Sequence, residues 1–126
     1  MEKIFEDDKI FMVKHNSQIP WVKIFTQKKH KELTECDMKT KQCIYKIIEI
    51  TEKAMLEFYK PEKINIAMFG NYFPHFHVHI MARFKDDDYF PEPMWGKKQR
   101  DGKLHLLPFD EFVRFLKLKL EAEILA

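Results

Sequence analysis

The sequence predicts an α+β domain in which an antiparallel sheet of about five strands carries one long central helix and a C-terminal helix. Three observations predict this class: short apolar runs typical of strands, two longer segments with apolar residues at helical spacing, and one segment with a strict two-residue period. With 126 residues, 45% of them hydrophobic, the chain is long enough for one core. Residues 1–126 are therefore expected to form a single domain.

Two strands are expected near the start of the chain. Residues 9–14 and 21–26 are rich in β-branched and aromatic side chains, and the linker between them carries Asn16, Ser17 and Pro20. This pattern predicts an antiparallel pair.

Two helices are expected, one central and one C-terminal. Residues 37–59 repeat apolar side chains at three- and four-residue steps, with Thr34 or Asp37 available as the N-terminal cap and Pro61 marking the end. Residues 109–125 carry an apolar face, and Asp110 and Glu111 suit the positive N-terminus of a helix.

The second strand pair contains the most informative segment. Residues 63–69 are expected to form a strand, 70–74 a turn, and 75–84 an antiparallel partner strand. Alternation then places His75, His77 and His79 on one face and apolar side chains on the other. Residues 85–108 contain two of the three glycines and several prolines, which predicts a long irregular loop of the kind that often has a function.

Composition excludes several partners. The chain has 22 Lys and Arg against 20 Asp and Glu without a long basic block, so nucleic acid is not expected as a partner. The charged start and the lack of a long apolar run argue against a membrane and favour a cytoplasmic location. Cys36 and Cys43 show no paired motif and are expected to be reduced thiols.

A row of three imidazoles is compatible with metal binding, with the polar outer face of a half-exposed strand, or with covalent catalysis. A strand rise of about 3.3 Å per residue separates the Cα atoms of His75 and His79 by roughly 13 Å, too far for one shared ion, so we expect no metal. Covalent catalysis needs a histidine held in one tautomer beside other donors. His77, flanked on both sides, is the candidate nucleophile.

The turn before the histidines adds an anion site. Gly70 and Asn71 can present backbone N–H groups and an amide toward the imidazole row, although Gly-Asn is also a common hairpin turn. Their place just before three aligned histidines points to a phosphate.

The chain resembles the histidine triad (HIT) superfamily. Residues 75–81 read His-Phe-His-Val-His-Ile-Met and match in full the signature His-φ-His-φ-His-φ-φ, where φ is apolar. Residues 63–74 and 82–88, the pair Pro20-Trp21, and the stretch 91–96 are similar to a bacterial branch of that family.

The resemblance implies a HIT-like fold and an enzyme, a nucleotidyl hydrolase or transferase that cleaves nucleoside phosphoramidates or dinucleoside polyphosphates. It implies a purine nucleotide or dinucleotide as substrate, no cofactor, and a homodimer. His77 would form a nucleotidyl-histidine intermediate, with His75 and His79 in support. The implied substrate contacts are Asn71, Asn65, Gly70 and Asn16, and Arg83 on the histidine face could meet a distal phosphate or pair with Asp86 or Asp87.

One position departs from the family pattern. Many relatives have a fourth histidine at the start of the second strand, a place taken here by Trp21 or Val22, and His30 does not match it. The alternative function is therefore a nucleotide-binding or scaffold protein with weak or no turnover. Trp21 is expected either to pack in the core or to wall the base pocket, and Trp95 either to pack or to close over the site.

Overall fold

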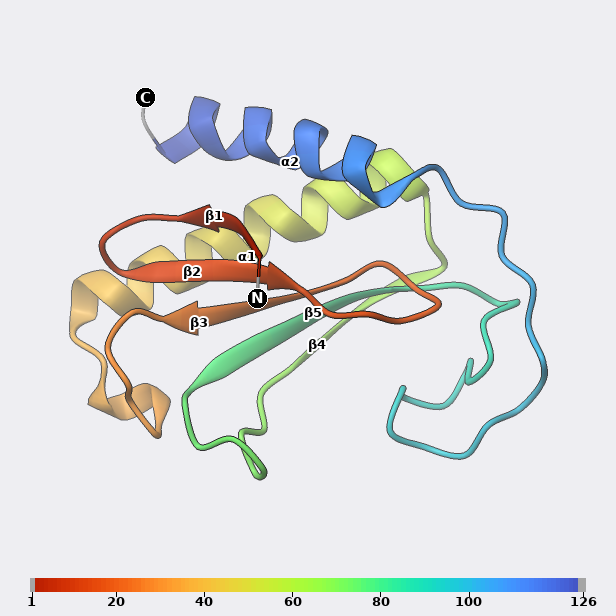
Figure 1. Cartoon of the computed structure of the whole chain (residues 1–126), viewed down its shortest axis with the longest axis horizontal. Coiled ribbons are helices and arrows are strands. Elements are labelled where there is room, and N and C mark those ends of the chain that lie inside the picture. Colours follow the sequence, from red (N-terminus) through yellow and green to blue (C-terminus); the bar gives the residue numbers. More distant parts are fainter. Residues whose placement is uncertain (1, 125–126) are drawn as a thin grey trace.

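Five antiparallel strands form one sheet, and two helices lie on one side of it in the computed structural model, which describes residues 2–124 (Figure 1). The sheet order is β1-β2-β3-β5-β4. The strands are β1 (Lys3–Glu6), β2 (Ile10–Lys14), β3 (Trp21–Thr26), β4 (Lys63–Ala67) and β5 (His77–Arg83). The predicted α+β class is confirmed.

The two predicted strand pairs form as expected. β2 pairs with β3, and β4 pairs with β5, both antiparallel. β3 also pairs with β5, which makes the histidine strand an interior strand of the sheet. β1, a short edge strand, was not predicted as a separate segment.

The histidine strand begins two residues later than predicted. The backbone N–H of His75 donates to the carbonyl of Phe73, and that of Phe76 donates to the carbonyl of His30. Neither bond belongs to the sheet ladder, so His75 precedes β5 rather than opening it.

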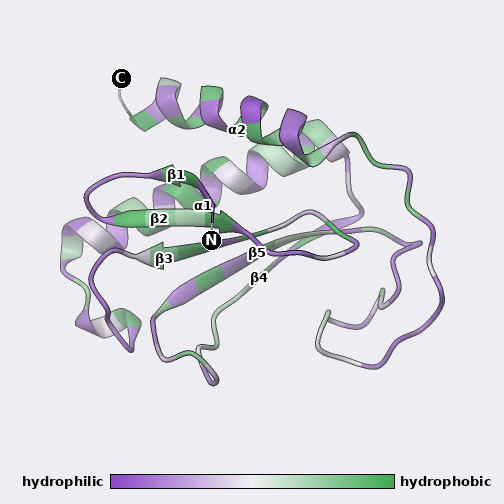
Figure 2. Ribbon diagram, in the orientation of Figure 1, coloured by the Kyte–Doolittle hydropathy of each residue, from purple (hydrophilic) through white to green (hydrophobic). Residues whose placement is uncertain are grey.

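The long helix α1 (Met38–Tyr59) follows a short 3-10 turn, η1 (Leu33–Glu35). The Asp37 side chain caps α1 by accepting a hydrogen bond from the Thr40 N–H, and Lys60 ends the helix in the left-handed conformation. α2 (Phe109–Ile124) packs on α1, and both helices alternate apolar and polar stripes (Figure 2). The main core lies between these helices and the sheet.

Both faces of β5 are buried. Phe76, Val78, Ile80 and Ala82 join the main core under the helices, as alternation predicts. On the other face, the exposed fractions of His75, His77 and His79 are only 9%, 8% and 7%. The alternative of a half-exposed polar strand face is therefore wrong.

The predicted loop, residues 85–108, is irregular and is fixed to the sheet at its start. Asp87, which is buried, forms an ion pair with Arg83 and accepts hydrogen bonds from three loop N–H groups. Asp88 binds Gln18 in the β2–β3 loop and the N–H of Gly102. These bonds hold the loop beside the start of β3.

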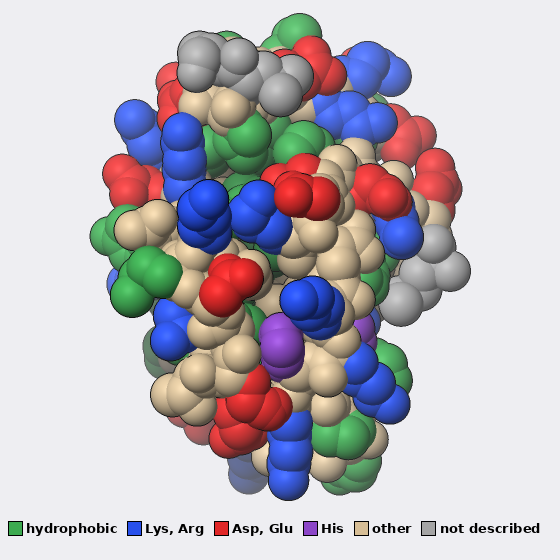
Figure 3. Space-filling model, turned by 90° about the vertical axis from the view of Figure 1, so that its left-hand side faces the viewer, with side chains coloured by type: hydrophobic (Ala, Val, Ile, Leu, Met, Phe, Trp, Pro, Cys, Tyr) green, Lys and Arg blue, Asp and Glu red, His purple; other side chains and the backbone are tan. Residues whose placement is uncertain are grey.

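Surface charge and hydropathy add two observations. Basic and acidic side chains alternate over the face in Figure 3 without a large patch of one sign. No helix within residues 2–124 is both long and apolar enough to cross a bilayer.

Cys36 and Cys43 are both free thiols.

Candidate active site

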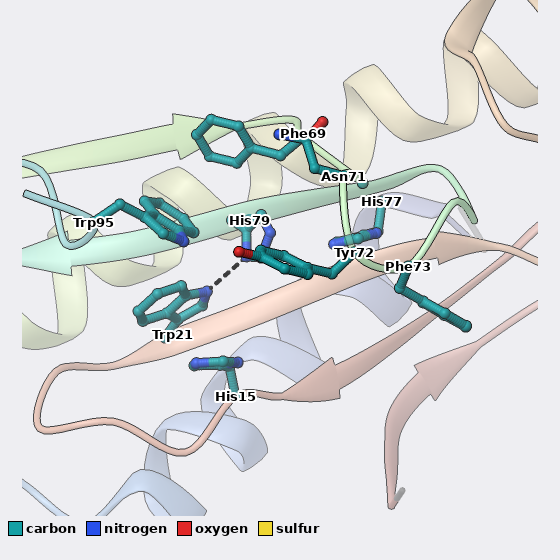
Figure 4. A pocket seen from close by; sticks show the side chains of 10 residues that line it. His15, Trp21, Phe69, Asn71, Tyr72, Phe73, His77, His79 and Trp95 are labelled. Atoms are coloured by element: carbon teal, nitrogen blue, oxygen red, sulfur yellow. Dashed lines mark hydrogen bonds between the residues drawn. The ribbon is translucent and has the colours of Figure 1, made fainter.

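A pocket of about 350 Å³ opens on the face of the sheet opposite the helices, over the start of β5 (Figure 4). Imidazoles and aromatic rings supply most of its wall. The lining residues are His15, Trp21, Phe69, Gly70, Asn71, Tyr72, Phe73, His77, His79 and Trp95.

His77 is held in one tautomer. Its Nδ1 lies 2.7 Å from the carbonyl oxygen of His75, and a carbonyl can only accept, so Nδ1 carries the proton. The ring stacks on Phe25 with centroids 4.7 Å apart. Nε2 is left with its lone pair, the state that a nucleophilic histidine needs.

His75 lies behind His77 rather than in the pocket wall. Its Nε2 is 2.6 Å from the carbonyl oxygen of Thr26, and its ring meets those of Phe11 and Phe25 edge-on. Its backbone carbonyl orients His77. His75 thus orients the His77 ring and does not line the pocket.

His79 has the second imidazole on the pocket floor. The indole Nε1 of Trp21 lies 3.0 Å from its Nδ1 and donates to it. Burial lowers the pKa of His79 to about 4, and the nearby His77, Lys23 and His15 act in the same direction. His79 is therefore neutral at neutral pH.

A third imidazole, that of His15, lines the pocket from an unexpected position. His15 follows β2, and its ring lies against Trp21 with centroids 4.0 Å apart and 6.5 Å from the His79 ring. Burial lowers the pKa of His15, as does Lys23. Of the two residues that could stand at the position of a fourth histidine, Trp21 lines the pocket and Val22 is buried in the main core.

Aromatic rings form the rim of the pocket. Trp95 lies edge-on to His79, Trp21 and Phe69, with centroid distances of 5.1, 5.2 and 4.7 Å. Tyr72 is fully exposed and extends across the mouth (Figure 4). Trp21 also packs with Ile19 and Met81, so the expected core packing is confirmed, and its ring lines the pocket as well. This rim can take a flat apolar group such as a nucleobase.

The local charge suits an anion. Lys23 faces His79 directly across β3 and β5, which puts its side chain on the histidine side of the sheet. Within the described residues, no Asp or Glu lines the pocket and none forms an ion pair with Lys23. No group of three or more His, Cys, Asp or Glu among residues 2–124 is placed to hold a metal ion.

The structure brings only some of the predicted contact residues together. Gly70 and Asn71 line the pocket, and Gly70 has a φ of 71°, in the left-handed region that favours glycine. Asn16 is exposed in the β2–β3 loop, next to His15 but outside the pocket wall.

Arg83 and Asn65 lie outside the pocket as well. Arg83 is 1% exposed, and its guanidinium donates to Asp87, to Oδ1 of Asn65 and to the Glu92 carbonyl. Its donors are engaged inside the protein, so it is not available to a distal phosphate. Asn65 faces Arg83 rather than a ligand.

Five residues at the site were not predicted from the sequence. They are the pocket-lining His15, Phe69, Tyr72 and Phe73, and Lys23 beside His79. The run Phe69-Gly-Asn-Tyr-Phe73 gave one usable signal, because three aromatic residues beside a Gly-Asn turn exceed what a hairpin needs. His15 and Lys23 gave none, since only the strand register brings them to the histidines.

Comparisons with known proteins agree with this geometry. A family model described as the HIT domain matches residues 1–86. A histidine triad protein from Bradyrhizobium japonicum is 26% identical, with a TM-score of 0.77 over 94% of this chain and 89% of that chain. One from Marinobacter aquaeolei is 26% identical, with a TM-score of 0.73 over 99% and 90% of the two chains. No curated protein matches. The chain belongs to the HIT domain family.

Proposed function

We propose that this protein is a nucleotidyl hydrolase or transferase that cleaves nucleoside phosphoramidates or dinucleoside polyphosphates through a nucleotidyl-histidine intermediate on His77. One observation carries the proposal: the Nδ1–H of His77 is bonded to the His75 carbonyl, so the Nε2 lone pair of a pocket-lining imidazole is free. Membership of the HIT family supports the same reaction class.

The reaction follows from this tautomer. The Nε2 lone pair of His77 attacks the α-phosphorus, a P–N bond forms, and the bond to the leaving group breaks with its electron pair on that group. Water then attacks phosphorus and gives a proton to the solvent, and the P–N bond breaks with its electron pair returning to Nε2. In a transferase another hydroxyl group takes the place of water. The His75 carbonyl stabilises the positive charge on the modified ring throughout.

The remaining pocket residues are proposed to bind the nucleotide. Trp95, Phe69 and Tyr72 would hold a purine base by stacking, and Gly70 and Asn71 would contact phosphate. The Lys23 charge attracts the phosphates. Asn16, next to His15, remains a proposed ribose contact.

A nucleotide-binding protein with little turnover is the second candidate. It is favoured by the departure from the family pattern in the sequence, where Trp21 or Val22 stands at the place of a fourth histidine that many relatives have. The two candidates share the pocket and differ only in whether His77 reacts.

Incubation with an adenosine phosphoramidate or a diadenosine polyphosphate tests the proposal. Mass spectrometry is expected to show a nucleotidyl adduct on His77 and release of mononucleotide. His77→Ala should lose the adduct and at least about a hundredfold in turnover, because no other group replaces the nucleophile. His105→Ala, at an exposed histidine in the 85–108 loop, is the matched control and should keep both.

Two outcomes separate the candidates. Tight nucleotide binding without adduct or product would favour the binding protein. Full turnover in His77→Ala would exclude His77 as the nucleophile.

We also propose a homodimer and a cytoplasmic location. β4 is an edge strand, and Ile66 on it and Met68 just after it expose apolar side chains, as expected of a strand that pairs with a second copy. Free thiols at Cys36 and Cys43 fit a reducing compartment.

A further inference from the structure

The Trp21–His79 hydrogen bond constrains the proton on His79. An indole nitrogen is only a donor, so the 3.0 Å contact requires a lone pair on Nδ1 of His79. The single proton of the neutral ring must then be on Nε2. Trp21 and His79 are both more than nine-tenths buried, which limits competition from water for this bond.

The imidazoles of His77 and His79 are therefore held in opposite tautomers. His77 is bonded through Nδ1 to a carbonyl and keeps a lone pair on Nε2. His79 is bonded through Nδ1 to an indole N–H and keeps a proton on Nε2. Their rings are 4.8 Å apart, so one phosphoryl group can meet a nucleophile and a hydrogen-bond donor together.

We propose that Trp21 is a positioning residue that keeps His79 as a neutral Nε2–H donor, and that the site consequently favours leaving groups that depart without a proton, namely the phosphate of an anhydride over an amine. This inference rests on the proposed reaction at His77.

The same bond opposes protonation of His79. A second proton would have to be added at Nδ1, where it would face the indole N–H across 3.0 Å. Burial, together with the nearby His77, Lys23 and His15, also lowers the pKa of His79 to about 4. His79 can thus donate a hydrogen bond to an oxygen but cannot act as an imidazolium acid at neutral pH.

The chemistry of the leaving group determines whether the lack of an acid at His79 slows the reaction. With an anhydride, the P–O bond breaks and its electron pair leaves on a phosphate that is stable as an anion, so no proton is needed. With a phosphoramidate, the P–N bond breaks and the amine must take a proton from solvent, because His79 supplies only a hydrogen bond. The second reaction is expected to be slower in this pocket.

The indole is held firmly enough for this role. Trp21 lies diagonally from His79 in the β3–β5 register, with ring planes at 70°. The His15 ring lies over it, Trp95 meets it edge-on, and Met81 packs against it. These contacts leave the Nε1–H aimed at His79 in Figure 4.

Nitrogen-15 NMR of histidine-labelled protein tests the tautomer. His79, assigned from a His79→Gln spectrum, is expected to show Nε2–H alone from pH 8 to about pH 5. Trp21→Phe keeps an aromatic ring but removes the donor, so His79 should show mixed tautomers and titrate at higher pH. Trp95→Phe, which alters a ring against His79 that donates no hydrogen bond to it, is the control and should leave the tautomer unchanged.

A measurement on the unaltered protein covers the case in which Trp21→Phe does not fold. A coupling across the hydrogen bond between the Trp21 and His79 nitrogens is expected in doubly labelled protein. An Nδ1–H tautomer in the unaltered protein, or an unchanged His79 in folded Trp21→Phe, would overturn the role of Trp21.

Kinetics test the leaving-group preference. At pH 7.5, kcat/KM for a diadenosine polyphosphate is expected to exceed that for an adenosine phosphoramidate by at least about tenfold, and Trp21→Phe should narrow the ratio. An equal or reversed ratio in the unaltered protein would overturn the preference. Turnover of neither substrate would refute the proposed function and the preference with it, while the NMR result would still decide the tautomer.

Discussion

At the scale of single residues, the chemistry of the pocket depends on which ring nitrogen of each histidine carries the proton. The three histidines stand in one row, but they do not share one tautomer. The Thr26 carbonyl and the Trp21 indole leave the proton of His75 and of His79 on Nε2, whereas the His75 carbonyl holds the proton of His77 on Nδ1. Only His77 combines a free Nε2 lone pair with a place in the pocket wall. In the proposed reaction, the neighbouring histidines therefore support His77 without competing with it.

His79 should make the protein less stable in mild acid. Because its folded pKa of about 4 lies below the ordinary value of 6.5, the unfolded chain binds more protons between these pH values. The free energy of unfolding therefore keeps the full contribution of His79 above about pH 6.5. It loses about 2 kcal/mol of this contribution, after allowance for solvent screening, as the pH falls to 4. Urea unfolding of the unaltered protein and of His79→Gln at pH 7.5 and pH 4.5 measures this.

The variant should lose less stability on acidification than the unaltered protein, because Gln does not titrate and its amide oxygen can still accept the Trp21 N–H. His105→Gln, at an exposed histidine, should behave like the unaltered protein. The same acid dependence in all three proteins would show that His79 is not held neutral.

At this scale the sequence predicts which residues share a face but not what they bond to. The alternation of side chains along β5 was enough to place His77 and His79 on one face and the apolar core residues on the other. The donor that sets the state of His79 is 58 residues away, on another strand. Nothing in the local pattern around Trp21 indicates that contact.

At the scale of elements, the pocket depends on a loop that is tied to β5 through Arg83. Asp87 binds Arg83 with two oxygens and accepts the N–H groups of Phe84, Tyr89 and Phe90. Burial acts to raise the pKa of Asp87, but these bonds outweigh it and the pKa lies below its ordinary value. The loop that carries Trp95 starts from this ion pair.

Asp87→Asn should destabilise the protein by about 3 kcal/mol, because it leaves the Arg83 charge buried without its partner. Asp86→Asn is a matched control one residue away, since Asp86 is exposed and should change the free energy of unfolding by less than about 0.5 kcal/mol. Chemical denaturation measures both. Equal effects of the two substitutions would show that the ion pair does not anchor the loop.

The elements themselves were largely predictable, because their signals are local. Each of these signals can be read from a short stretch of sequence. Examples are the cap at Asp37, the helical spacing of residues 37–59 and the alternation in β5. β1 has only four residues with a charge at each end, too short for a periodic signal. The path of the 85–108 loop depends on partners such as Gln18 and Asp88, 70 residues apart, which no local pattern reveals.

At the scale of the whole molecule, the two edges of the sheet differ. α2 packs beside β1 at one edge, whereas β4 at the other leaves Ile66 41% exposed. An open edge with apolar side chains is a template for another strand. The proposed homodimer therefore uses the β4 edge.

Ile66→Lys should shift the protein toward the monomer, because a charge on an edge strand opposes pairing with a second copy. Sedimentation velocity at matched concentrations measures the change. Leu118→Lys is the control: Leu118 is an exposed leucine on α2, away from β4, and its replacement should leave the assembly unchanged. A monomeric unaltered protein would refute the dimer, and an Ile66→Lys protein that still dimerises would place the interface elsewhere than this edge.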